Sequence, residues 1–141
     1  MPAESLWTIP ELDPDSQPEL SGDSPASILQ TQAEIIRDAT GDRLIGEVFV
    51  YELEADPETG VSPDFETVAS LALRPHGRAG WRVTIVEAFY DEPGLYPCEL
   101  RLGGEDATRR CADAEAFRRE LKELLSGSWT QESLRKLLQR S

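Results

Sequence analysis

The chain has 141 residues, 39% of them hydrophobic and 29% charged, which suits one globular domain of ordinary size with its own core. Its 27 acidic and 14 basic side chains give a net charge of −13 at pH 7. A charge of this sign disfavours binding to nucleic acid and to anionic lipid, and no apolar run in the sequence is long enough to span a bilayer.

Residues 1–23 are predicted to form an acidic, Pro-rich extended arm, followed by a single α+β domain over residues 24–141. The segment from residue 4 to residue 25 holds six carboxylates and no Lys or Arg, yet it contains Leu6, Trp7 and Ile9. Three interpretations stay open for these apolar residues: docking on the chain's own sheet, a disordered tail, or a motif that adds to the sheet of another protein.

A helix is predicted to follow the arm. Ser24 is a suitable N-cap, and Pro25 at the first helical position loses nothing by lacking an N–H. Apolar residues then recur at helical spacing up to Ala39. Gly41 is expected to end the helix in the left-handed conformation.

Four strands are predicted next, over residues 44–53, 65–75, 81–92 and 95–104. The first strand is apolar on both parities, so we expect it to be covered on both faces. Pro97 cannot donate a ladder hydrogen bond, which favours an edge position or an irregular start for the fourth strand. Because the connections are short, the strands should form a four-stranded antiparallel meander.

Two helices are predicted to close the chain. The first starts near Asp113 and ends at Gly127. In the second, Thr130 is expected to be the N-cap, with Trp129 packed on Leu134 as a hydrophobic staple. Helices that precede and follow a run of strands predict an α+β domain with the helices on one face of the sheet.

The sequence contains no recognisable catalytic motif. Its single histidine, His76, lies in a turn sequence, and the acidic run from Glu52 to Asp64 fails the calcium-loop pattern. We therefore predict no catalytic residues, no metal site and no cofactor. Cys98 is expected to be a buried structural thiol, and neither it nor Cys111 is expected to be a reactive nucleophile.

The compartment is inferred from the cysteines and from the start of the sequence. Two cysteines without a secretory signal predict a cytoplasmic protein with reduced thiols. The charge is uneven along the chain: residues 1–73 hold 16 acids and two bases, whereas residues 74–141 hold 11 acids and 12 bases. This asymmetry favours a basic protein partner, or serves solubility alone.

The stretches "ILQTQAEIIRDATGDRLIGEV", "GWRVTIVEAFYD" and "LYPCELRL" resemble a group of small bacterial proteins of unknown function, over about residues 28–125. The resemblance implies no activity and assigns no functional residue. In size, acidity and α+β content the chain is also similar to class I secretion chaperones, although those interrupt their sheet with a helix.

These observations predict a non-enzymatic interaction protein, such as an accessory, immunity or chaperone-like subunit. It would bind a protein partner, or a second copy of itself, through its acidic N-terminal half and its sheet. The candidate contact residues are Leu6, Trp7, Ile9, Glu52, Glu54 and Asp56.

Two alternatives remain. The first is a small-molecule-binding protein or small enzyme with a pocket between the sheet and the C-terminal helices, lined by Trp81, Tyr90 and Tyr96. The second is an acidic surface that mimics DNA.

Overall fold

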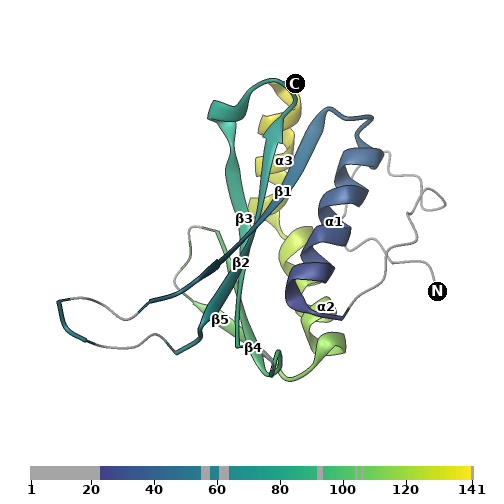
Figure 1. Ribbon diagram of the computed structural model, residues 1–141. Coiled ribbons are helices and arrows are strands. Elements are labelled where there is room, and N and C mark those ends of the chain that lie inside the picture. Colours follow the sequence, from purple (N-terminus) through teal and green to yellow (C-terminus); the bar gives the residue numbers. More distant parts are fainter. Residues whose placement is uncertain are drawn as a thin grey trace.

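The computed structural model describes residues 23–54, 58–60, 64–91, 94–103, 105 and 107–140. Within them the chain forms an α+β fold with one helix before the sheet and two after it, as Figure 1 shows. The fold class predicted from the sequence is therefore confirmed. The predicted arm, apart from Asp23, lies outside the described residues.

Five strands form one antiparallel sheet in the order in which they occur in the chain. Their bounds are Leu44–Glu52 (β1), Thr67–Pro75 (β2), Val83–Tyr90 (β3), Cys98–Leu102 (β4) and Thr108–Cys111 (β5). The meander is confirmed, but the prediction of four strands is wrong by one.

The extra strand, β5, escapes sequence analysis because it is short and polar. Its sequence is Thr-Arg-Arg-Cys, and three of its four side chains are exposed, so it shows no alternation of apolar residues. It pairs with β4 from Cys98↔Cys111 to Arg101↔Thr108. The expectation that the strand after Pro97 could be an edge is therefore wrong, since β4 lies between β3 and β5.

Helix α1 (Pro25–Ala39) has the predicted ends. The Ser24 side chain accepts a hydrogen bond from the Ser27 N–H at 3.1 Å, and Gly41 has φ +58° just after the helix. Helix α2 (Ala114–Ser126) is capped by Asp113, whose carboxylate accepts from the Ala116 N–H at 2.8 Å. Both caps satisfy donors that a helix start leaves unpaired.

Helix α3 (Ser128–Gln139) differs from the prediction at its start. It begins two residues before Thr130, with Gly127 at the N-cap position. Thr130 is fully buried inside the helix, and its hydroxyl donates to the Leu124 carbonyl at the end of α2, at 2.7 Å. Thr130 therefore joins two helices instead of capping one.

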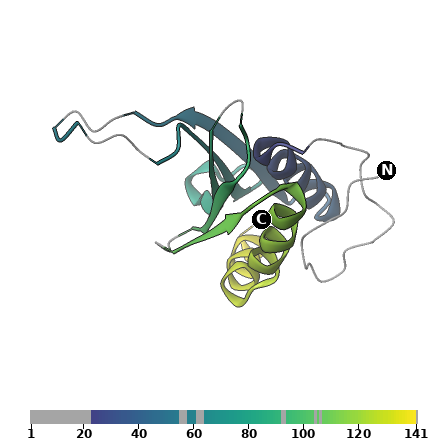
Figure 2. The same cartoon turned by 90° about the horizontal axis from the view of Figure 1, so that it is seen from below.

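All three helices cover one face of the sheet (Figures 1 and 2). Helix α1 packs on β1 and β2, α2 on β4 and β5, and α3 on β2. The core lies between these layers and contains residues from every helix and strand, including Ile36, Leu44, Leu71, Ile85, Leu100, Cys111, Phe117 and Leu134. No α-helix of the described residues lies on the other face of the sheet.

Helix α1 approaches β1 closely at Gly46. A Cβ atom at this position would lie 2.8 Å from both the Cα and the Cβ of Ala33 on α1. The missing side chain lets the helix approach the strand. This contact places α1 over the first half of β1, while the second half runs on away from the helix (Figure 1).

The expectation that the first strand is covered on both faces is only half right. Leu44 and Ile45 are buried, but the burial decreases steadily along β1, and its last four residues are exposed. The reason is tertiary: α1 covers the start of the strand, and no described element covers its end.

Candidate protein-binding edge

Strand β1 forms one edge of the sheet, and its hydrogen-bonding pattern shows which backbone groups face outward. The Leu53 N–H donates to the Glu66 carbonyl at 2.7 Å, and the Arg43 carbonyl accepts from the His76 N–H at 3.0 Å. The backbone N–H and C=O groups of the odd-numbered β1 residues therefore point toward β2. In an antiparallel ladder the alternate residues point their N–H and C=O groups the other way, so Val48 and Val50 direct theirs away from the sheet.

Three consecutive apolar side chains on this strand are exposed: Phe49 to 41%, Val50 to 52% and Tyr51 to 48%. Phe49 and Tyr51 lie on the helix-free face, and Val50 lies on the opposite face, beyond α1. An edge strand that is apolar and exposed on both sides is a template for pairing with another chain. This end of β1 is therefore the candidate binding site.

Acidic side chains surround this site. Glu52 and Glu54 follow the exposed residues directly, and both are exposed. Across the hairpin, Asp64 and Glu66 are exposed as well. The sequence from residue 44 to residue 73 contains no Lys or Arg. The hairpin end of the site is therefore acidic in sequence, and acidic surfaces attract cationic segments.

Arginine side chains lie on the helix-free face next to the site, and one of them contacts Phe49. Glu47 accepts from Arg74 at 2.9 Å and from Arg82 at 3.1 Å, and the Arg82 guanidinium lies 5.2 Å from the centre of the Phe49 ring. Arg101 pairs with Glu87 at 2.7 Å and lies 5.0 Å from the Phe89 ring. These contacts shield the middle of the sheet without a helix.

The structure brings together only part of the predicted contact residues. Glu52 is the last residue of β1, Glu54 follows two residues later, and both side chains are exposed. Leu6, Trp7, Ile9 and Asp56 lie outside the described residues. Sequence reasoning did not identify Phe49, Val50 and Tyr51 as candidate contact residues, because their apolar character indicated burial.

The aromatic residues of the alternative hypothesis have three different environments. Trp81, at the end of a short 3-10 helix (η1, Ala79–Trp81), is exposed and stacks under Arg140 at 3.8 Å. Tyr90 is buried in the core. Tyr96 packs edge-to-face against Phe117, with ring centres 6.5 Å apart.

Tyr96 also binds the segment that leads into α1. Its hydroxyl donates to the Asp23 backbone carbonyl, and the Asp23 carboxylate pairs with Arg118 at 2.7 Å. Burial raises the pKa of the Tyr96 phenol above its usual value. This residue thus has a structural role in positioning the segment that enters α1.

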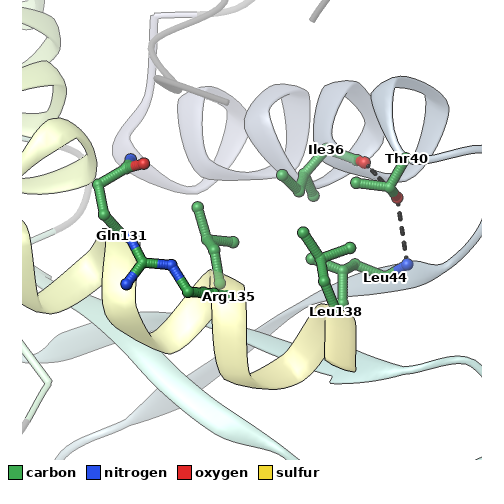
Figure 3. Close-up of a pocket in the computed structure, with 7 residues that line it drawn as sticks. Ile36, Thr40, Leu44, Gln131, Arg135 and Leu138 are labelled. Atoms are coloured by element: carbon green, nitrogen blue, oxygen red, sulfur yellow. Dashed lines mark hydrogen bonds between the residues drawn. The ribbon is translucent and has the colours of Figure 1, made fainter. Parts of the chain in front are cut away.

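Figure 3 shows an apolar pocket between α1, α3 and the start of β1. Its volume is about 100 Å³, and it is lined by Ile36, Thr40, Leu44, Gln131, Leu134, Arg135 and Leu138. The Thr40 hydroxyl bridges the Ile36 carbonyl and the Leu44 N–H on one side of it. This volume is well below the roughly 300–1,000 Å³ typical of ligand sites.

A second, wider groove lies on the helix-free face. Its volume is about 230 Å³, and its lining combines apolar and charged side chains: Leu53, Asp64, Phe65, Phe89, Glu99, Arg101 and Thr108. The groove begins at Leu53, two residues after the exposed Tyr51. It therefore extends the candidate edge across the sheet. Neither pocket includes Trp81, Tyr90 or Tyr96.

Among the described residues, no helix combines the length and the hydropathy that crossing a membrane requires. Comparison of the chain with protein-family models, with curated proteins and with solved structures finds no match.

Proposed function

We propose that this protein is a non-enzymatic interaction module whose β1 edge receives an extended segment of another protein. The observation that carries the proposal is the exposure of three successive apolar side chains, Phe49, Val50 and Tyr51, on an edge strand. Strand addition would satisfy the outward backbone groups and bury these side chains in one step.

The proposed partner segment is basic. Glu52, Glu54 and Glu66 lie at the hairpin end of the edge, and a segment with Lys or Arg beside its apolar residues would complement them. A second copy of this chain fits less well, because each copy carries a net charge of −13. Charge thus favours a heterologous partner over a homo-oligomer.

The test changes a backbone group on the outer side of β1 and leaves the side that pairs with β2 unchanged. Val50→Pro removes a backbone N–H that points away from the sheet, so it should block strand addition while leaving the β1–β2 ladder intact. Val50→Thr is the matched control, because threonine keeps the N–H and favours strands. The partner segment is first located by cross-linking and mass spectrometry in native lysate, and its synthetic peptide is then titrated into purified protein.

We expect the peptide to bind wild type and Val50→Thr with similar affinity, and Val50→Pro at least tenfold more weakly. In the wild-type background, Glu52→Gln and Glu54→Gln should weaken peptide binding and make the affinity less dependent on salt. Equal binding to Val50→Pro would overturn the strand-addition proposal. A wild-type homodimer that Val50→Pro dissociates would overturn the assignment of a basic heterologous partner.

A further inference from the structure

Cys98 and Cys111 are the only two cysteines of the chain, and the fold places them opposite each other. Cys98 begins β4, and Cys111 ends β5. They are direct partners in the antiparallel register, so both side chains project toward the helix layer. Both are fully buried in the core.

The geometry of this pair suits a disulfide. Directly opposed residues of antiparallel strands have Cα atoms about 4.5 or 5.5 Å apart, and disulfides join Cα atoms about 4.4–6.8 Å apart. Both side chains lie on the same face of the β4–β5 ladder and belong to the same buried core. A bond between the sulfurs therefore requires no change of strand register.

We propose that Cys98 and Cys111 form an oxidisable dithiol, which a peroxide converts into an intrachain disulfide that joins β5 to β4. This assigns a modification site to a pair that the sequence presents only as two separated cysteines without a Cys-x-x-Cys motif. The proposal is independent of the β1 edge, since it concerns the opposite edge of the sheet.

The two thiols differ in their surroundings. Interaction with Cys98 lowers the pKa of Cys111, whereas interaction with Cys111 and burial raise the pKa of Cys98. Arg109 and Arg119 also favour the Cys111 thiolate, whereas Glu120 and burial oppose it. Cys111 lies on the edge strand β5, and Cys98 lies on β4 between β3 and β5, so we assign the first attack to Cys111 and the resolving step to Cys98.

The reaction balances with peroxide as the oxidant. The Cys111 thiolate attacks one peroxide oxygen, the O–O bond breaks, and the departing hydroxide takes up a proton to give water and a sulfenic acid. The Cys98 thiol then loses its proton, and its sulfur attacks the Cys111 sulfur and displaces hydroxide, which becomes a second water. Two thiols thus lose two electrons and two protons, and the peroxide is reduced to two waters.

The position of β5 provides access for the oxidant. This strand has four residues and pairs only with β4 among the described strands. Its other support is α2, to which Arg109 is joined by ion pairs with Glu120 at 3.0 Å and Glu123 at 2.9 Å. Short edge strands open locally more readily than central ones, so transient separation of β5 would expose both sulfurs.

The experiment treats the reduced, full-length chain with hydrogen peroxide and follows its intact mass. We expect the mass to fall by about 2 Da, the mass of two hydrogens, and the number of thiols titrated after denaturation to fall from two to zero. Proteolysis should yield a Cys98–Cys111 cross-linked peptide. The oxidised chain should contain no disulfide to a second copy, and its melting temperature should rise by several degrees and return on reduction.

Three results would overturn the proposal: two thiols that still titrate after peroxide treatment and denaturation, a disulfide-linked dimer as the main product, or a gain of oxygen mass without loss of two hydrogens. Cys98→Ala and Cys111→Ala should each abolish the mass loss and the thermal shift. The peptide map of the wild-type chain keeps the test decisive if either variant folds poorly.

Discussion

The Tyr96 side chain links the segment just before α1 to the core. Its ring packs against Phe117, and its hydroxyl donates to the Asp23 carbonyl, next to the ion pair of Asp23 with Arg118. The sequence indicates this tyrosine as a pocket residue, whereas the structure gives it a defined hydrogen bond within the chain. Ionisation of the Tyr96 phenol should therefore affect the free energy of unfolding.

The raised pKa of Tyr96 predicts how stability depends on alkaline pH. In the unfolded chain a tyrosine ionises near pH 10, while the buried phenol of the folded chain keeps its proton. Above that pH the unfolded state binds fewer protons than the folded state, so the free energy of unfolding must fall as pH rises. The contribution of the Tyr96 phenol to stability is fully present at pH values below its pKa in the unfolded chain.

We therefore expect wild type to lose more stability than Tyr96→Phe between pH 8 and pH 11, as measured by urea unfolding at each pH. At pH 8 the variant should be less stable, by about 0.5–1.5 kcal/mol for the lost hydrogen bond. Tyr51→Phe, at an exposed position, is the control. An alkaline loss of equal size in wild type and Tyr96→Phe would contradict the assignment.

At the scale of elements, the approach of α1 to β1 determines which part of β1 is covered. Gly46 lies under Ala33, and only a residue without a side chain permits this contact. The helix covers Leu44 and leaves Val50 exposed. One glycine in a strand thus helps to define the boundary between the core and the candidate binding edge.

Gly46→Ala should destabilise the domain, because the new Cβ would lie 2.8 Å from backbone and side-chain atoms of Ala33. We expect a loss of about 1–3 kcal/mol in the free energy of unfolding, typical of overpacked sites. Urea unfolding measures it. Gly80→Ala is the matched control, since a Cβ there meets no atom within 4 Å; equal effects of the two variants would show that the helix contact is unimportant.

At the scale of the whole molecule, the net charge of −13 is concentrated in the half of the chain that carries the β1 edge. Like charges on the surface repel one another in the folded state. Local attraction opposes this only where bases are present, as at Glu47 with Arg74 and Arg82. The end of the β1–β2 hairpin has no such bases in its sequence.

Added salt should therefore stabilise the protein. Raising NaCl from 0.01 M to 0.15 M shortens the screening length from about 30 Å to about 8 Å, and we expect the melting temperature to rise. A variant with Glu52→Gln, Glu54→Gln and Glu66→Gln should be more stable at low salt and respond less to NaCl. Glu47→Gln should instead be less stable, because it removes attractive pairs; a melting temperature that falls with NaCl would contradict this account.

The sequence by itself determines the α+β class, the antiparallel meander and most helix ends. These features depend on local signals: Ser24, Gly41 and Asp113 act on their own neighbours, and short connections leave few topologies. Only the tertiary structure decides that Thr130 bonds to α2, that Cys98 on β4 faces Cys111 on β5, and that Phe49, Val50 and Tyr51 are exposed. Burial depends on what packs over a residue, and the contact of α1 with β1 ends before these side chains. The periodicity of the β1 sequence carries no information about where that contact ends.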